Sequence, residues 1–277
     1  MYFESRSKES RMILKYRFQK RLKMWPRIGP IPTYGVFYFS GIFCHFLIAY
    51  YLAKRYKLRH RVWITVSICY MLGMTIGAKA LFDVQHVQFD LRALLSISHY
   101  MKGGLWGGLL AYFCLSVPLA LLLSHRKCAA LDLVAVSTPI PWIFAKVGCL
   151  FNGCCYGKAC SMPWAITFPE GARGAPAGIP LHPTQIYEIL IVLFIFVLFI
   201  LLKRRWASGT MLLWFLILYG LGRAATELWR GDADHHLYIG PPTLSQLICL
   251  VVAGVSILLL CLHWYLYRLI KPDEVLI

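Results

Sequence analysis

Long apolar runs alternate with short polar stretches along most of this chain. Seven of these runs approach the length of roughly 20 residues that a helix needs to cross a hydrocarbon core of about 30 Å. They cover residues 34–52, 62–81, 103–123, 131–150, 185–202, 211–227 and 244–262. Because lipid offers the backbone no hydrogen-bond partner, each run predicts a helix. The pattern therefore predicts an all-α, polytopic membrane protein with about seven transmembrane helices.

The composition and the spacing of the runs predict a single membrane domain. Hydrophobic residues make up 59% of the 277 residues and charged residues only 15%, whereas soluble domains carry roughly 25% charged residues. We assign residues 34–277 to this domain and residues 1–33 to a basic N-terminal tail. Residues 12–25 interleave apolar and basic side chains, which fits an interfacial helix or a disordered tail. Residues 151–184 are rich in proline and predict an ordered loop domain between the fourth and fifth helices.

Basic residues gather beside the predicted spans and contribute to a formal net charge of +17. On a soluble chain such a charge would favour nucleic acid as a partner, but beside a span it sets topology and contacts anionic lipid. Clusters at residues 54–61, 126–127 and 203–205 fall on alternate loops, so these loops are expected to be cytoplasmic. The loop domain then faces outward, and no nucleic-acid partner is expected.

Polar clusters stand at the mouths of several spans, where ionisable groups are costly to place and are functional candidates by default. The fifth span is introduced by His182, Gln185, Tyr187 and Glu188. At the third span, Lys102 is followed by four glycines in six positions, beginning with Gly103 and Gly104. An accessible backbone beside a cation suits a phosphate group, and close helix packing is the alternative.

Polar residues also mark the first, second and sixth spans. Tyr34 opens the first span and Lys79 ends the second, where an interfacial anchor and a snorkelling lysine are the structural alternatives to a substrate contact. Near the end of the sixth span, Arg223, Glu227 and Arg230 are spaced to share one helical face. They form either a structural ion network or a phosphate site in which Glu227 orients the two arginines, and we favour the phosphate site.

Four cysteines lie close together at the end of the fourth span: Cys149, Cys154, Cys155 and Cys160. Pro139 and Pro141 precede them and are expected to break or kink that helix. The cysteine spacing matches no standard zinc pattern, so no metal site and no cofactor is predicted. On an oxidising outer side, we expect a structural disulfide joining Cys154 or Cys155 to Cys149 or Cys160, with a reactive thiolate as the alternative.

In their order along the chain, these blocks resemble bacterial prolipoprotein diacylglyceryl transferase. The matching blocks are Tyr34-Gly35, Gly77-Ala78-Lys79, Lys102-Gly103-Gly104-Leu105, residues 146–153, residues 182–188, residues 219–223 with Glu227 and Arg230, and Leu244-Ser245-Gln246. The resemblance implies a multi-pass protein of the bacterial inner (cytoplasmic) membrane, with its active site toward the outer face. It also implies transfer of the diacylglyceryl group of phosphatidylglycerol to a lipobox cysteine thiol, with release of glycerol phosphate.

The chain departs from the family pattern at several polar positions. Lys102 stands where the family has a histidine, and Lys79 and Lys146 stand where it has arginines. Cys149 replaces an asparagine and Cys154 replaces a glutamate of the fourth-helix signature. Lysine is a compact point charge and arginine a bidentate fork, so these changes should alter the geometry of phosphate binding.

The resemblance also implies roles for the individual residues. Lys102, Lys146 and Arg223 would clamp the lipid phosphate, and neutral Lys102 or His182 would act as the catalytic base. The expected substrate-binding residues are Tyr34, Lys79, Gly103, Gly104, Asn152, Gly153, Gln185, Tyr187, Glu188, Glu227 and Arg230. The expected partners are an anionic phospholipid, phosphatidylglycerol, and an acceptor that is a protein, a peptide or another nucleophile. The alternatives are a lipid or glycerophosphate transferase with a non-lipoprotein acceptor, and a non-catalytic lipid-binding protein.

Overall fold

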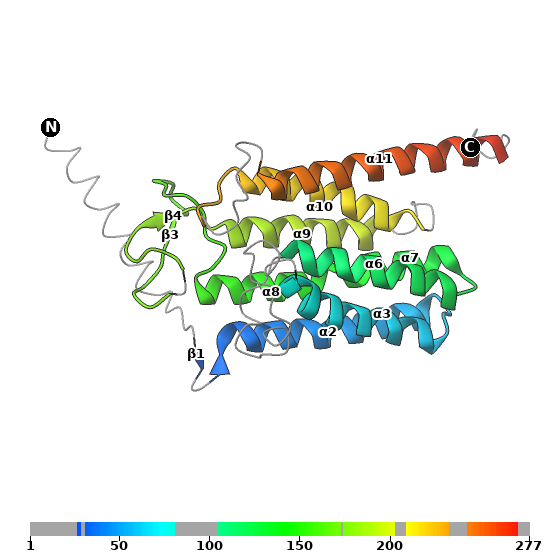
Figure 1. Cartoon of the computed structure of the whole chain (residues 1–277), viewed down its shortest axis with the longest axis horizontal. Helices are drawn as coiled ribbons and strands as arrows, with labels where there is room; N and C mark the ends of the chain where they lie inside the picture. The colour runs from blue at the N-terminus through cyan, green and yellow to red at the C-terminus, as the bar shows by residue number, and fades with distance from the viewer. Residues whose placement is uncertain are drawn as a thin grey trace, which may run out of the picture.

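The computed structural model describes residues 27–28, 31–80, 105–172, 174–202, 209–232 and 243–270. Its helices lie side by side with their long axes roughly aligned, and a loop region that carries β3 and β4 covers one end of this bundle (Figure 1). The helices are α2 (Thr33–Arg55), α3 (His60–Leu72), η1 (Gly73–Gly77), α6 (Leu105–Leu123), α7 (Lys127–Ser137), α8 (Pro139–Asn152), α9 (Thr184–Leu202), α10 (Met211–Glu227) and α11 (Leu244–Ile270).

The predicted class of a polytopic, helical membrane protein is confirmed. With α3 and η1 taken as one rod and α7 and α8 as another, the described residues form seven helical rods. Five stretches are long and apolar enough to cross a membrane: Thr33–Arg55, His60–Ala80, Lys127–Asn152, Thr184–Leu201 and Ser245–Tyr267. The third and sixth predicted spans are also helices: α6 contains the apolar stretch Gly107–Leu123, and α10 has 17 residues. The outward surface of the bundle carries many exposed apolar side chains, such as Phe194 and Leu258, as contact with lipid requires.

Two local sequence features shape the rods. Pro139 lies at the start of α8, where its missing N–H needs no helical partner, so the predicted break in the fourth span is confirmed. The second rod contains the π-helical turn η1, and its glycines let α6 approach closely. A Cβ on Gly73 would lie 2.6 Å from the backbone nitrogen of Tyr112, and one on Gly77 would lie 2.5 Å from the carbonyl oxygen of Gly107. Larger residues at these two positions would therefore push α6 away.

The described residues of the loop between α8 and α9 include two short strands, and they are attached to the end of α10. Strands β3 (Ile166–Thr167) and β4 (Pro180–Leu181) pair antiparallel, and Phe168 packs with Ala175 in a small core beneath them. Backbone hydrogen bonds join Lys158 to Trp229 at 2.7 Å and Gly231 to Tyr156 at 3.0 Å. A second short ribbon, β1 (Arg27–Ile28) with β2 (Ile31–Pro32), precedes α2.

The basic loops that follow α2 and precede α7 lie at the opposite end of the bundle from β3 and β4 (Figure 1). Arg126, before α7, donates from Nη1 to the carbonyl oxygen of Tyr56, after α2, at 3.2 Å. Two of the three predicted cytoplasmic clusters therefore meet at this end. The third, residues 203–205, lies outside the described residues, as do residues 1–26 of the predicted tail. The predicted boundary between tail and membrane domain stays a prediction.

Candidate functional site

Buried charges from three helices meet at the loop end of the bundle. Lys146 of α8 donates from Nζ to Oε1 of Glu188 of α9 at 2.9 Å, and Nε of Arg223 of α10 lies 3.7 Å from the same oxygen. Arg223 also pairs with Glu227, whose Oε2 lies 3.8 Å from Nε of Arg230. These five side chains are at most 6% exposed. Burying so many charges is tolerable only because each one faces an opposite charge.

Glu227 lies between the two arginines, which is the arrangement that the sequence predicted. Arg223 and Glu227 belong to α10, whereas Arg230 follows the last helical residue and bends back toward Glu227. Arg230 is held from its other side by Asp232, which accepts from Nε at 2.8 Å through Oδ1. Within the described residues, this network balances three cations against three carboxylates.

In the charge network and beside it, three polar atoms have no hydrogen-bond partner among the described residues: Nε of Arg223, Oε2 of Glu227 and Oε1 of Gln185. All three side chains are nearly fully buried, and the atoms of Arg223 and Glu227 take part in ion pairs only. Buried polar groups are nearly always satisfied, so an unsatisfied donor or acceptor in such a network needs an explanation. Nε of Arg223 is a donor that an incoming anion can use without breaking an existing hydrogen bond.

The polar side chains from His182 to Glu188 do not all contact the charge network. His182 Nδ1 lies 3.0 Å from the hydroxyl of Tyr187, which also accepts from the indole of Trp164 at 2.8 Å. Gln185 donates to the carbonyl oxygen of Cys154 at 2.7 Å, while Glu188 faces Lys146. No described hydrogen bond or ion pair links His182 to the charge network. The predicted role of His182 as a base therefore stays a prediction.

The end of α8 forms the turn that the sequence singled out at Asn152 and Gly153. Asn152 is buried, and Gly153 adopts a left-handed conformation with φ of 75° while its N–H donates to Cys149 at 2.9 Å. A Cβ on Gly153 would lie 2.8 Å from the Cβ of Ala172, so only glycine fits. The ring of Tyr34 lies against the helix at Gly148, which brings the start of α2 to the same region.

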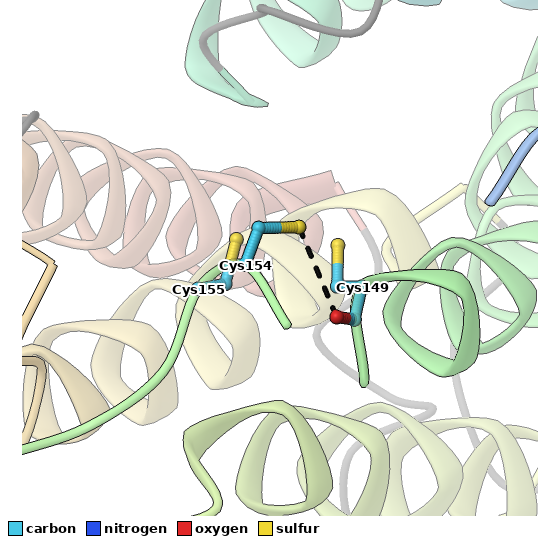
Figure 2. A group of neighbouring side chains, drawn as sticks. All are labelled: Cys149, Cys154 and Cys155. Carbon is cyan, nitrogen blue, oxygen red and sulfur yellow. Dashed lines mark hydrogen bonds between the residues drawn. The ribbon is translucent and has the colours of Figure 1, made fainter. Parts of the chain in front are cut away.

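The expected disulfide is absent: all ten cysteines lie within the described residues, and all are free thiols. Instead, the sulfur atoms of Cys149, Cys154 and Cys155 lie within 4.8 Å of one another (Figure 2). Cys160 is not part of this group. The disulfide prediction assumed that neighbouring thiols would pair, but the turn gathers three sulfurs at distances longer than the roughly 2 Å of an S–S bond.

The pKa values of Cys154 and Cys155, the two thiols beyond the end of α8, are shifted in opposite directions. Hydrogen bonds with Cys149 and Cys154 lower the pKa of Cys155 well below its usual value, and Lys146 and Arg230 contribute to this shift against the effect of burial. A hydrogen bond with Cys149 would lower the pKa of Cys154, but Cys155 and burial raise it to about 12. Of these two thiols, Cys155 is therefore the more acidic.

The remaining predicted residues lie at or beyond the edge of what the structure describes. Lys79 is only 1% exposed, so the alternative that it snorkels toward water is wrong. Lys102, Gly103 and Gly104 lie outside the described residues. Their part in the site stays a prediction.

The sequence assigned no role to three residues that belong to the site: Tyr219, Thr184 and Asp232. The hydroxyl of Tyr219 donates to Oε2 of Glu188 at 3.4 Å, and Thr184 donates to the carbonyl oxygen of Cys155 at 2.6 Å. Tyr219 also borders a small apolar pocket between α6, α10 and α11, lined by residues such as Phe113, Phe215 and Val252. The pairing of Asp232 with Arg230 could have been predicted, because the two residues are only two positions apart. The contacts of Tyr219 and Thr184 join segments far apart in the sequence and could not be predicted from local spacing.

Comparison with known proteins identifies relatives along most of the chain. The family described as prolipoprotein diacylglyceryl transferase matches residues 24–262. The phosphatidylglycerol–prolipoprotein diacylglyceryl transferase of Finegoldia magna is 26% identical over 250 residues, which cover 88% of this chain and 95% of that protein. The protein of the same name from Geobacter sulfurreducens is 28% identical over 228 residues, covering 78% and 84%. That of Glaesserella parasuis is 28% identical over 264 residues, covering 88% and 93%.

Proposed function

Because the chain belongs to the prolipoprotein diacylglyceryl transferase family, we propose that it moves the diacylglyceryl group of phosphatidylglycerol onto a cysteine thiol of a prolipoprotein. The family is one of membrane transferases, and the relatives described above are named for this donor and this acceptor. The observation that carries the proposal is the buried charge network of Lys146, Arg223 and Arg230, in which Nε of Arg223 lacks a hydrogen-bond partner among the described residues.

The lipid phosphate is the anion that this network suits best. A phosphate oxygen accepts from Nε of Arg223, and Lys146 lies on the other side of Glu188 from it. The described cations and carboxylates already balance, so a phosphate needs further positive charge. Lys79 and Lys102 supply it in this proposal, in line with the resemblance of their blocks to the family. A buried, preorganised set of donors stabilises the charge that grows on the leaving phosphate far more than water does.

A small apolar pocket lies beside Tyr219, with room for only a short part of one acyl chain. Tyr219 donates its hydroxyl to the charge network and also lines this pocket, so a polar and an apolar surface meet at one residue. A phospholipid has the same division between headgroup and acyl chains. We therefore place the glycerol carbons of the donor near Tyr219, with the phosphate toward Arg223.

The reaction breaks one bond and forms another at a glycerol carbon. The sulfur of the acceptor cysteine attacks the carbon that carries the phosphate ester, a C–S bond forms, and the C–O bond to phosphate breaks. The electron pair of that bond leaves with glycerol phosphate, and a base takes the proton of the acceptor thiol. His182 and neutral Lys102 are the candidates for this base.

We place the site at the outer face of the bacterial inner membrane. The basic loops that include Tyr56 and Arg126 meet at the opposite end of the bundle, and positive loops remain cytoplasmic. Cysteines introduced at residues 57 and 127 in a variant without other reactive thiols should react with a membrane-impermeant maleimide only after the membrane is opened. Labelling of both positions in intact cells would contradict this orientation.

The test of the activity uses the full chain in lipid nanodiscs with phosphatidylglycerol labelled in its diacylglyceryl group and a lipobox peptide. We expect label on the peptide thiol and loss of this product in Arg223→Ala. Arg126→Ala, at the other end of the bundle, is the matched control and should retain activity. Release of glycerol phosphate without a lipidated peptide would indicate a different acceptor. Lipid binding without any turnover would indicate a non-catalytic protein.

A further inference from the structure

Three thiols converge where α8 ends, and no bond joins them. Cys149 lies in the last turn of α8, and Cys154 and Cys155 lie in the turn that follows. Their sulfurs are all within 4.8 Å of one another, and Cys149 is only 7% exposed (Figure 2). The three residues come from a short segment, and their side chains bring the three sulfur atoms close together.

The backbone around this point is held in an uncommon shape. Cys155 has a φ of 58°, a left-handed conformation that residues other than glycine seldom adopt. Thr184 and Gln185, at the start of α9, hold the carbonyl oxygens of Cys155 and Cys154 at 2.6 and 2.7 Å. The thiol of Cys154 lies 3.8 Å from the carbonyl oxygen of Cys149. Hydrogen bonds from a second helix therefore fix the turn that brings the sulfurs together.

We propose that Cys149, Cys154 and Cys155 form a binding site for one thiophilic, closed-shell metal ion, Zn²⁺ or Cu⁺. Three sulfurs around a metal at about 2.3 Å each lie about 4 Å apart, and the observed spacing needs little adjustment to reach this value. Soft thiolate ligands select these ions over Mg²⁺ or Ca²⁺. Cu⁺ is satisfied by three thiolates, whereas Zn²⁺ keeps a fourth position for solvent or another ligand.

The charges nearby favour a site made of thiolates. Lys146 and Arg230 both interact electrostatically with Cys155, and both are buried. Three thiolates leave one negative charge with Zn²⁺ and two with Cu⁺. Lys146 and Arg230 are already paired with carboxylates, so they lower the cost of this charge without neutralising it.

This site departs from the expectation drawn from sequence spacing, which predicted no metal. Standard zinc patterns use two pairs of ligands, with the cysteines of a pair separated by two to four residues. Among the three clustered cysteines only Cys149 and Cys154 have such a spacing, at its upper end, and Cys155 is adjacent to Cys154. The ligands here are one residue of a helix and two adjacent residues of a left-handed turn. Their suitability depends on the turn and not on the spacing.

Metal content of the full-length protein tests the proposal without lipid or acceptor, so the outcome is independent of transferase activity. Protein is purified without oxygen from cells grown with added zinc or with added copper, and its metal is measured by mass spectrometry. We expect about one metal ion per chain in one of the two arms. Cys149→Ser, Cys154→Ser and Cys155→Ser should each lower metal affinity by at least about tenfold. Cys160→Ser, in the same loop but outside the cluster, is the matched control and should retain the metal.

A second measurement needs no variant. Wild-type protein is alkylated with and without the metal, and each cysteine is quantified by peptide mass spectrometry. Metal should protect the three clustered thiols and leave Cys160 reactive. Equal metal content in the wild type and in the triple serine variant would overturn the proposal. Wild-type protein that contains no metal after growth with zinc and after growth with copper would also overturn the proposal. A disulfide between clustered cysteines in protein alkylated at harvest would do the same.

Discussion

The two ends of α10 both bury carboxylates, but they satisfy them differently. At the start of the helix, Asp132 of α7 accepts from the backbone N–H of Gly209 at 2.9 Å and of Met211 at 3.4 Å. At its other end, Glu188 and Glu227 face the side chains of lysine and arginine. The first arrangement caps a helix N-terminus, where backbone donors and the helix dipole both favour a negative charge.

The difference separates a structural carboxylate from functional ones. Backbone donors cannot leave Asp132 without unwinding the start of α10, so this contact is permanent. Side-chain cations can turn toward a new anion, and Arg223 has an unused donor with which to do so. Buried charge is therefore informative about function only when its partner is also a charged side chain.

Replacing Glu188 by glutamine should have the largest effect on stability. The change removes the carboxylate that faces both Lys146 and Arg223 and leaves two buried cations short of negative charge. We expect a loss of about 3–5 kcal/mol in the free energy of unfolding, measured by thermal or denaturant unfolding in detergent. Glu170→Gln changes an exposed carboxylate of the loop and should have almost no effect. Equal stability of the two variants would show that Lys146 and Arg223 can stay buried without the carboxylate of Glu188.

Arg223→Ala should reduce transfer with less effect on folding, because Glu227 retains Arg230 as a partner. Loss of a donor aimed at developing charge typically lowers kcat by on the order of 10²–10³. Arg223→Lys retains the charge but not the fork and should recover part of the activity. The measurement is initial rate of peptide lipidation. Full activity in Arg223→Ala would exclude it from the phosphate site.

Asp132→Asn is the matched change at the other end of α10. The carbonyl oxygen of an asparagine can still accept from both backbone N–H groups, so mainly the negative charge at the helix N-terminus is lost. We therefore expect a loss of about 1 kcal/mol in unfolding free energy and normal transfer rates. Unfolding in detergent and the lipidation assay measure the two effects. A large loss of activity at normal stability would mean that the start of α10 also takes part in function, contrary to the distinction drawn above.

Thr184→Val should also have only a small effect on stability. It removes the hydrogen bond to the carbonyl oxygen of Cys155 and should cost about 1 kcal/mol. Because that hydrogen bond holds the left-handed turn, metal affinity should fall more than it does in Thr75→Val, where a hydroxyl bonded within its own rod is lost. Metal content and unfolding are compared in the same preparations. Unchanged metal affinity would show that the turn keeps its shape without α9.

The helices could be predicted from the sequence because, in lipid, the backbone hydrogen bonds of a span are made within that span. Every backbone group in a span must bond within its own segment, so apolar length alone indicates where a helix lies. The predicted sixth span coincides with α10 at both ends, and the predicted fifth span differs from α9 by one residue. The spacing of Arg223 and Glu227 likewise predicted their pairing, since positions four apart meet on any helix.

Which side chains of different helices contact one another is determined by the tertiary structure and not by the local sequence. Lys146 meets Glu188 across 42 residues of sequence, and Asp132 reaches Gly209 across 77, contacts that no local pattern specifies. The same holds for the cysteines: the sequence placed them together, but the turn held by Thr184 and Gln185 decides that they meet as three free thiols and not as a disulfide. Side-chain partners depend on packing between helices, because rotation of one helix by a fraction of a turn exchanges every contact it makes.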